Sequence, residues 1–164
     1  MYCAIIGKSI FEMASGLDEK SPKCIELKLE IAKTLSELSA MGVSDFICNA
    51  EWGFSLFGAE ILLGMCQTAL VKAKLHIIAP FEEQSVMWTN EARERYFNVH
   101  VAADSVKFVT RRKRTDSYRV CDKAIIDKCA ILLTDDEGCF AAQYAQVNDK
   151  EQIVLGKSNS NCIL

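Results

Sequence analysis

The sequence predicts a doubly wound α/β fold, with a mostly parallel sheet of five to six strands and helices on both faces. Short apolar runs alternate with longer helical patterns along the chain, and this alternation is typical of parallel sheets with crossover helices. Each apolar run also ends in a polar or glycine-containing turn. Ligands of such sheets bind beyond the carboxyl ends of the strands, where strand order reverses.

The composition favours one domain and excludes several classes of protein. The 164 residues, half of them apolar, suffice for one domain at 1–155, with a tail at 156–164. The net charge of −3 gives no general attraction to nucleic acid or anionic membranes, so neither is expected as a partner. Eight cysteines lie in apolar segments without a C-x-x-C pair and are expected to be reduced core residues: Cys3, Cys24, Cys48, Cys66, Cys121, Cys129, Cys139 and Cys162.

The stretch from Phe46 to Met65 predicts a strand, a tight turn and a buried helix. The helix N-terminus would favour an anion, and Gly53 would let a ligand approach the backbone closely. Glu60 is the only charged residue between Phe54 and Val71, so it needs a partner or a cleft. The short apolar N-terminus does not suit a signal peptide, and 54–71 is too polar for a membrane span. A cytoplasmic location is therefore expected.

The N-terminal third predicts a strand at Tyr2–Ile6, a loop at 7–20 and an amphipathic helix. The helix begins at Ser21-Pro22, with serine as the N-cap, and Gly42 closes it. The loop is long enough to be a binding loop. In it, Lys8 is either a phosphate ligand or a solvated lysine.

The middle of the chain predicts a strand at Leu75–Ala79 that Pro80 ends, followed by a helix that Trp88 opens. Ala92, Tyr96, Val99 and Ala103 share one face of that helix. His76, which has no partners in the sequence pattern, is expected to be a hydrogen-bonded core or edge residue and not a catalyst.

The remaining segments follow the same alternation. The strand at Val106–Thr110 precedes four cations, Arg111 to Arg114, which either grip phosphates or form a solvated loop. After a helix from Asp116 or Ser117 to Lys128, a strand at Ala130–Thr134 runs into Asp135–Gly138. Those acidic residues either hold ribose hydroxyls or a metal, or form an ordinary turn. A helix at Phe140–Val147 and a strand at Gln152–Leu155 complete the domain.

Several motifs between residues 44 and 146 resemble the YpsA-like family of the SLOG superfamily, whose other members include the DNA-processing protein DprA and the LOG phosphoribohydrolases. These motifs are Trp52-Gly53 through Ala59-Glu60, Ile78-Ala79-Pro80-Phe81 with Gln84 and Trp88, Arg95-Tyr96, and Asp127 before an apolar strand. The resemblance implies a Rossmann-like domain that binds or senses a nucleotide or nucleotide-derived ligand. The turn at Asn49 to Gly53 would receive a phosphate.

The chain departs from the family pattern at four places. Family members commonly have Ser-Gly at Asn49-Ala50, an acidic residue at Ser55, Arg-Asn at Cys121-Asp122 and Gly-Gly-Thr at Gly138-Cys139-Phe140. Each departure removes backbone freedom or a polar contact. The sequence therefore leaves open whether the ligand has changed or binding is weak or lost.

The resemblance and the strand ends together give one set of ligand-binding candidates: Gly7, Lys8, Asn49, Ala50, Glu51, Gly53, Ser55, Glu60, Pro80, Phe81, Gln84, Trp88, Arg111, Asp122 and Gly138. Phe81 and Trp88 either wall a base or ribose, or pack onto the core. No metal and no certain cofactor are expected, although a nucleotide or ADP-ribose-like ligand fits. A homo-oligomer stays open.

Two other functions are weighed against ligand binding. A nucleotide N-glycosidase of the LOG kind would use Glu60 as its catalytic carboxylate, but the Pro-Gly-Gly-x-Gly-Thr-x-x-Glu motif of that branch is missing. A DNA-associated protein resembling DprA would use Arg111 to Arg114 on phosphates, against the acidic net charge.

Overall fold

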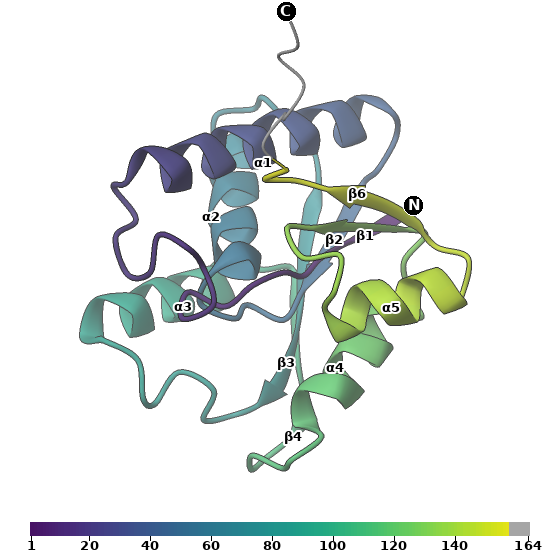
Figure 1. Ribbon diagram of the computed structural model, residues 1–164. Coiled ribbons are helices and arrows are strands. Elements are labelled where there is room, and N and C mark those ends of the chain that lie inside the picture. Colours follow the sequence, from purple (N-terminus) through teal and green to yellow (C-terminus); the bar gives the residue numbers. More distant parts are fainter. Residues whose placement is uncertain (158–164) are drawn as a thin grey trace, which may run out of the picture.

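The computed structural model describes residues 1–157, which form one parallel sheet in the order β4-β3-β2-β1-β5-β6 (Figure 1). Every pairing between neighbouring strands is parallel. Strand order reverses between β1 and β5. The doubly wound α/β class predicted from the sequence is confirmed. The strands are β1 Tyr2–Ile5, β2 Asp45–Cys48, β3 Lys74–Phe81, β4 Ser105–Thr110, β5 Ile131–Thr134 and β6 Glu151–Val154.

Helices cover both faces of this sheet (Figure 1). The helices are α1 Pro22–Ala40, α2 Phe54–Gln67, α3 Asn90–Ala102, α4 Ser117–Ile126 and α5 Phe140–Val147. One core cluster joins α1, α2 and α3 to strand residues such as Cys3 and Phe46. A second cluster joins α4 and α5 to the alternate strand residues, such as Ala4 and Ile47. The period of two along each strand therefore divides the core between the two faces.

The helix boundaries follow local capping chemistry where the sequence shows it. The Ser21 hydroxyl accepts a hydrogen bond from the Cys24 amide, and Pro22 takes the first helical position of α1. Gly42 has a φ of 97° just beyond the end of the helix. Helix α2 ends at Gln67, earlier than the apolar pattern suggested. Among the described residues, no helix combines the length and apolarity that a membrane crossing requires.

Two predicted boundaries around β3 are wrong. The strand does not end before Pro80 but continues to Phe81, which pairs with Thr110. Strand β2 accompanies β3 only as far as Ile77, so the missing N–H of Pro80 leaves no ladder hydrogen bond unmade on that side. Trp88 lies before α3, and the Thr89 hydroxyl caps this helix by accepting the Ala92 amide.

The cysteines of the described residues are all free thiols, as expected. Five of the seven are buried, and Cys66 and Cys139 are partly exposed. Cys162 and most of the expected tail lie outside the described residues. Of that tail, Gly156 and Lys157 contact the domain through Glu30 and Glu137, respectively.

The loop between β1 and α1 is fastened to the turn between β2 and α2. Ser9 and Gly53 form an isolated antiparallel bridge. The Ile10 amide donates to the Trp52 carbonyl at 2.7 Å, and the Phe54 amide donates to the Lys8 carbonyl at 3.0 Å. Gly53 has a φ of 138°, and a Cβ there would lie 2.4 Å from the Lys8 carbonyl oxygen. Only glycine fits this crossing.

We expect Gly53→Ala to lower the free energy of unfolding by about 2 kcal/mol or more, because it combines an unfavourable φ with a backbone collision. Gly64→Ala in α2 is the matched control, since a Cβ there meets nothing within 4 Å. It should stabilise the protein by up to about 1 kcal/mol through helix propensity. Urea unfolding measures both free energies. Equal effects of the two substitutions would contradict the claim that only glycine fits at position 53.

Candidate functional site

The candidate segments all lie at the carboxyl edge of the sheet, because all six strands run in the same direction. Gly7 and Lys8 follow β1, Asn49 to Glu51 follow β2, and Gln84 follows β3. The basic loop Arg111–Arg114 follows β4, and Asp135–Gly138 follows β5. The edge nevertheless divides into regions with different contacts.

A cavity of about 530 Å³ lies at the carboxyl ends of β1 and β5, where strand order reverses. The Asp135 carboxylate at its margin accepts a hydrogen bond from the Lys8 amide at 2.8 Å. Gly7 packs so closely that a Cβ would lie on Asp135 Oδ1 and the Phe54 ring. The lining combines both charges with apolar groups: Lys8, Met13, Ala14, Ser15, Lys23, Cys24, Glu26, Leu27, Glu30, Asp135, Gly156 and Lys157.

The N-terminus of α2, where a phosphate was expected, faces the protein's own backbone. The Phe54 amide is already bonded to Lys8, and the space above Gly53 is filled by residues 8–10. The Ser55 hydroxyl donates to the Ile5 carbonyl at 3.0 Å and is buried. Gly53 and Ser55 therefore have structural contacts in place of the ligand contacts expected from the sequence.

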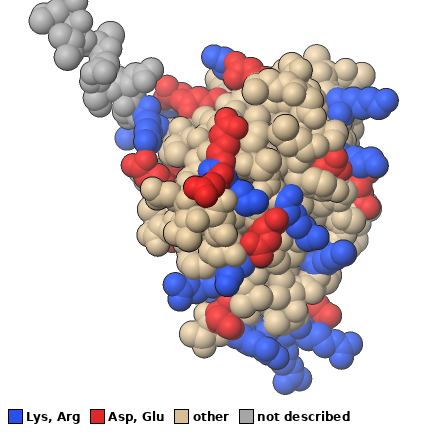
Figure 2. All heavy atoms as spheres, turned by 90° about the vertical axis from the view of Figure 1, so that its right-hand side faces the viewer, with Lys and Arg blue, Asp and Glu red and all other residues tan. Residues whose placement is uncertain are grey.

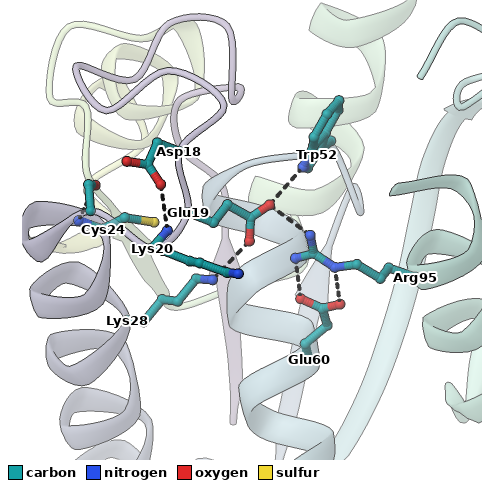
Figure 3. A network of polar contacts seen from close by, with 9 residues as sticks. Asp18, Glu19, Lys20, Cys24, Lys28, Trp52, Glu60 and Arg95 are labelled. Atoms are coloured by element: carbon teal, nitrogen blue, oxygen red, sulfur yellow. Dashed lines mark hydrogen bonds and ion pairs between the residues drawn. The ribbon is translucent and has the colours of Figure 1, made fainter. Parts of the chain in front are cut away.

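Glu60 is likewise held within the protein (Figure 3). Arg95 of α3 donates from Nε and Nη2 to the two carboxylate oxygens of Glu60, each at 2.8 Å. The third contact of the guanidinium, from Nη1, reaches Glu19 at 2.7 Å. Both oxygens of the Glu60 carboxylate are therefore occupied by Arg95, and the sequence did not indicate this partner because it is 35 residues away.

Glu19 is the centre of this network, and from the loop between β1 and α1 it connects that loop to two helices and to the turn before α2 (Figure 3). It accepts hydrogen bonds from Arg95, Lys28 and the Trp52 indole. Burial alone would raise the pKa of Glu19, but these hydrogen bonds outweigh it and lower the pKa from 4.5 to about 2.

The aromatic candidates Phe81 and Trp88 pack onto neighbouring rings. Trp88 contacts Trp52 and Tyr96, with ring centroids 6.1 and 5.3 Å apart. Phe81 is buried and meets Tyr118 edge to face at 5.9 Å. Core packing, the second of the two interpretations given for these residues, accounts for both.

Beside Phe81, four polar side chains meet at the carboxyl ends of β2 and β3 and at α4; we call them the acceptor cluster: Asn49, Glu51, Gln84 and Asp122. The Asn49 amide donates from Nδ2 to Asp122 at 3.3 Å and accepts from the Glu51 backbone at 3.0 Å. Gln84 donates from Nε2 to the Asn49 carbonyl at 3.2 Å. Two candidates distant in sequence, Gln84 and Asp122, are thus brought together with Asn49 and Glu51.

The turn that carries this cluster is kept in a conformation that favours glycine. Ala50 has a φ of 53°, in the left-handed region, and is fully buried. The side chain of Asn49 stabilises the turn by accepting the amide of Glu51. The departure from glycine at Ala50 therefore leaves the backbone path intact, at a cost of about 1 kcal/mol in strain.

Both carboxyls of the acceptor cluster have raised pKa values. Burial, with the nearby Asp122 and Glu12, raises the pKa of Glu51 from 4.5 to about 8, although a hydrogen bond from Tyr118 opposes the shift. Burial also raises the pKa of Asp122 from 3.8 to about 7. No ion pair among the described residues includes either carboxyl. Such shifts in partly buried groups mark candidate functional sites.

The remaining candidates lie on exposed loops. Figure 2 shows Lys and Arg side chains gathered at the lower end of the molecule, where the loop after β4 lies. There, Arg111 to Arg114 are exposed, and Arg111 is 3.8 Å from Glu82. Gly138 donates its amide to the Asp136 side chain in an ordinary polar turn. Within residues 1–157, no three His, Cys, Asp or Glu side chains are grouped to hold a metal ion.

His76 lies away from this edge, in the amino-terminal half of β3. Its ring nitrogens contact Ser105 Oγ at 2.8 Å and Asp45 Oδ1 at 2.9 Å. The expected hydrogen bonding of this histidine is therefore confirmed.

Comparison with known proteins identifies the family. The family model YpsA, described as the YspA SLOG family, matches residues 3–156. The chain belongs to this SLOG family. A UPF0398 protein of Bacillus cereus is 26% identical over 98% of this chain and 89% of its own length. UPF0398 proteins of Staphylococcus epidermidis and Halalkalibacterium halodurans are each 25% identical, over 96% and 77% of this chain and 84% and 69% of their own lengths. Membership of a SLOG family fits a nucleotide-related function.

The network around Glu19 should make part of the stability of this SLOG domain depend on pH. Because the folded pKa lies below the unfolded value, the contribution is complete above pH about 4.5 and is lost as pH falls towards 2. We expect Glu19→Gln to lower the free energy of unfolding by about 2 kcal/mol at pH 7 and by less at pH 3.

Urea unfolding at the two pH values measures this difference. Glu37→Gln is the control, because its ion pair with Lys33 is exposed and long, at 3.9 Å, and should contribute less than about 0.5 kcal/mol. A Glu19→Gln effect that does not change with pH would contradict the ionic role.

The acceptor cluster predicts the opposite pH dependence. The folded pKa values of Glu51 and Asp122 lie above the unfolded values, so ionisation weakens the fold as pH rises from about 4 to 8. We expect Asp122→Asn and Glu51→Gln to raise the free energy of unfolding by about 1–3 kcal/mol at pH 8, and by less at pH 5.

Thermal unfolding as a function of pH checks this gain. The exposed Glu94 of α3 provides a control, and Glu94→Gln should leave the pH profile unchanged. If Asp122→Asn destabilises the protein at every pH, the carboxyl stabilises the fold, and the expected cost of burying its ionised form is contradicted.

Proposed function

We propose that the protein binds a nucleotide-derived ligand at the carboxyl edge of its sheet, with the phosphate end in the cavity beside β1 and β5. The observation that carries the proposal is the position of this cavity, at the point where strand order reverses. Doubly wound folds bind their ligands there. The volume of about 530 Å³ lies within the range of small-molecule sites. Membership of a SLOG family supports the same class of ligand.

The lining of the cavity supports an anionic group at one end. Lys8 and Lys23 contribute ammonium groups. Lys23 and Cys24 belong to the first turn of α1, where the helix dipole is positive. This helix replaces α2 as the one whose N-terminus faces the site, because the loop between β1 and α1 covers α2.

The carboxylates and apolar groups of the same lining suit polar, uncharged parts of a ligand. Asp135 and Glu30 are acceptors for hydroxyl or amino groups, and Leu27 and Met13 provide apolar contact. Burial raises the pKa of the Asp135 carboxyl, against the hydrogen bond from the Lys8 amide. A phosphate near the lysines and sugar hydroxyls near the carboxylates would match this division of charge.

The alternatives suggested by resemblance have less support. A nucleotide N-glycosidase needs a carboxylate free to act on the substrate, whereas Glu60 is bound on both oxygens by Arg95. A DNA-associated role would rest on Arg111 to Arg114, which are exposed at the same edge, in a chain with a net charge of −3. Ligand binding in the cavity requires neither a free Glu60 carboxylate nor DNA contacts from Arg111 to Arg114.

We expect nucleoside monophosphates and diphosphates to raise the melting temperature, because a ligand that binds only the folded state stabilises it. Lys8→Met should weaken that binding by about tenfold, the effect of losing one charge-assisted hydrogen bond. Lys33→Met is the matched control, since Lys33 lies on α1 outside the cavity lining and is exposed.

Thermal-shift screening followed by calorimetric titration checks both expectations. The proposal is overturned if no nucleotide changes the melting temperature, or if Lys8→Met and Lys33→Met bind as tightly as the unaltered protein.

A further inference from the structure

The acceptor cluster is separate from the cavity lining, and one donor of each of its amides is used within the protein. One amide hydrogen of Asn49 is directed to Asp122, and one of Gln84 is directed to the Asn49 carbonyl. The cluster offers a ligand several acceptor atoms: the carboxyls of Glu51 and Asp122 and the side-chain oxygen of Gln84.

Gln84 gives an independent indication that a ligand group is needed here. The residue is only 5% exposed, and its Oε1 atom is buried without a hydrogen-bond partner in the described part of the chain. Its amide head lies between the Asn49 carbonyl and Tyr118, which places it inside the cluster. A buried acceptor without a donor destabilises the folded state, and a donor from a ligand would remove that cost.

The charges around the cluster point the same way. Burial is the main cause of the raised pKa of Glu51, and the carboxyls of Asp122 and of Glu12, from the loop between β1 and α1, raise it further. Within residues 1–157 neither Glu51 nor Asp122 takes part in an ion pair. The loop that carries Glu12 also carries Lys8 and Met13 of the cavity. An anionic group would be repelled here, whereas N–H or O–H donors would be attracted.

We propose that the acceptor cluster is a recognition subsite for a ligand group that presents two or more hydrogen-bond donors from adjacent atoms. Two parts of a nucleotide have this chemistry: the N1–H and exocyclic amino group of guanine, and the cis-diol of ribose. The inference rests on the proposed function, and it adds the property by which the site distinguishes one nucleotide from another.

Both donor sets can be removed one atom at a time. Inosine monophosphate lacks the exocyclic amino group of guanosine monophosphate, and 2′-deoxyguanosine monophosphate lacks one hydroxyl of the diol. The unaltered protein should bind guanosine monophosphate at least tenfold more tightly than one of these two analogues, because a buried acceptor that loses its donor is left unpaired. The analogue that binds more weakly identifies the donor group.

Calorimetric titration of the three nucleotides measures this discrimination in the unaltered protein, in Asp122→Asn and in Glu51→Gln. Each substitution keeps the shape but replaces an acceptor by an amide with donors, and at least one should reduce the discrimination to less than threefold. Glu94→Gln, on the exposed face of α3, should leave it unchanged.

The outcomes separate the two proposals. Binding of all three nucleotides with equal affinity, still weakened by Lys8→Met, overturns the subsite and leaves the proposed function standing. Discrimination that persists in both Asp122→Asn and Glu51→Gln also overturns the subsite. Absence of any nucleotide binding overturns both.

Discussion

The attachment of the loop between β1 and α1 to the N-terminus of α2 decides where this molecule can hold a ligand. The antiparallel contact between Ser9 and Gly53 and the hydrogen bond from Phe54 to Lys8 occupy the helix end that a βα turn would otherwise present. Glu19 reinforces the attachment, since it binds Lys28 of α1, Trp52 of the turn and Arg95 of α3. The open space lies instead between this loop, the first turns of α1 and the end of β5.

A division of charge follows from that arrangement. Lysines and the start of α1 face the cavity on one side of the loop, while carboxyls from β2 and α4 gather on the other. Within residues 1–157, Glu51 has no ion pair to offset its burial. Raised pKa values, a left-handed Ala50 and an unpaired Gln84 oxygen all occur in this one small region. Local strain of this kind is commonly retained at functional sites.

How well the sequence predicted the contacts of a candidate residue depended on how close its partners are along the chain. The turn at Asn49 to Glu51 and the residues Gln84 and Asp122 do lie together, because parallel strands bring their carboxyl ends to one edge. For Glu60, a lone carboxylate on an apolar helix correctly indicated a partner but not its identity, because Arg95 is far away in the sequence. Neither Glu19 nor Tyr118 carried a signal, since nothing near them in the sequence suggests their partners.

By itself the sequence determined the class of fold, the order of its elements and the approximate position of most of their boundaries, because these depend on periodicity and on caps such as Ser21-Pro22 that act within a few residues. It also determined the family, through motifs that stay together along the chain. Only the tertiary structure showed that Gly53 accommodates the chain's own backbone and that Arg95 pairs with Glu60. It also showed that Glu51 and Asp122 have no such cation among the described residues. Those outcomes depend on contacts between segments that are 33 to 73 residues apart, and the pattern within any single segment does not contain them.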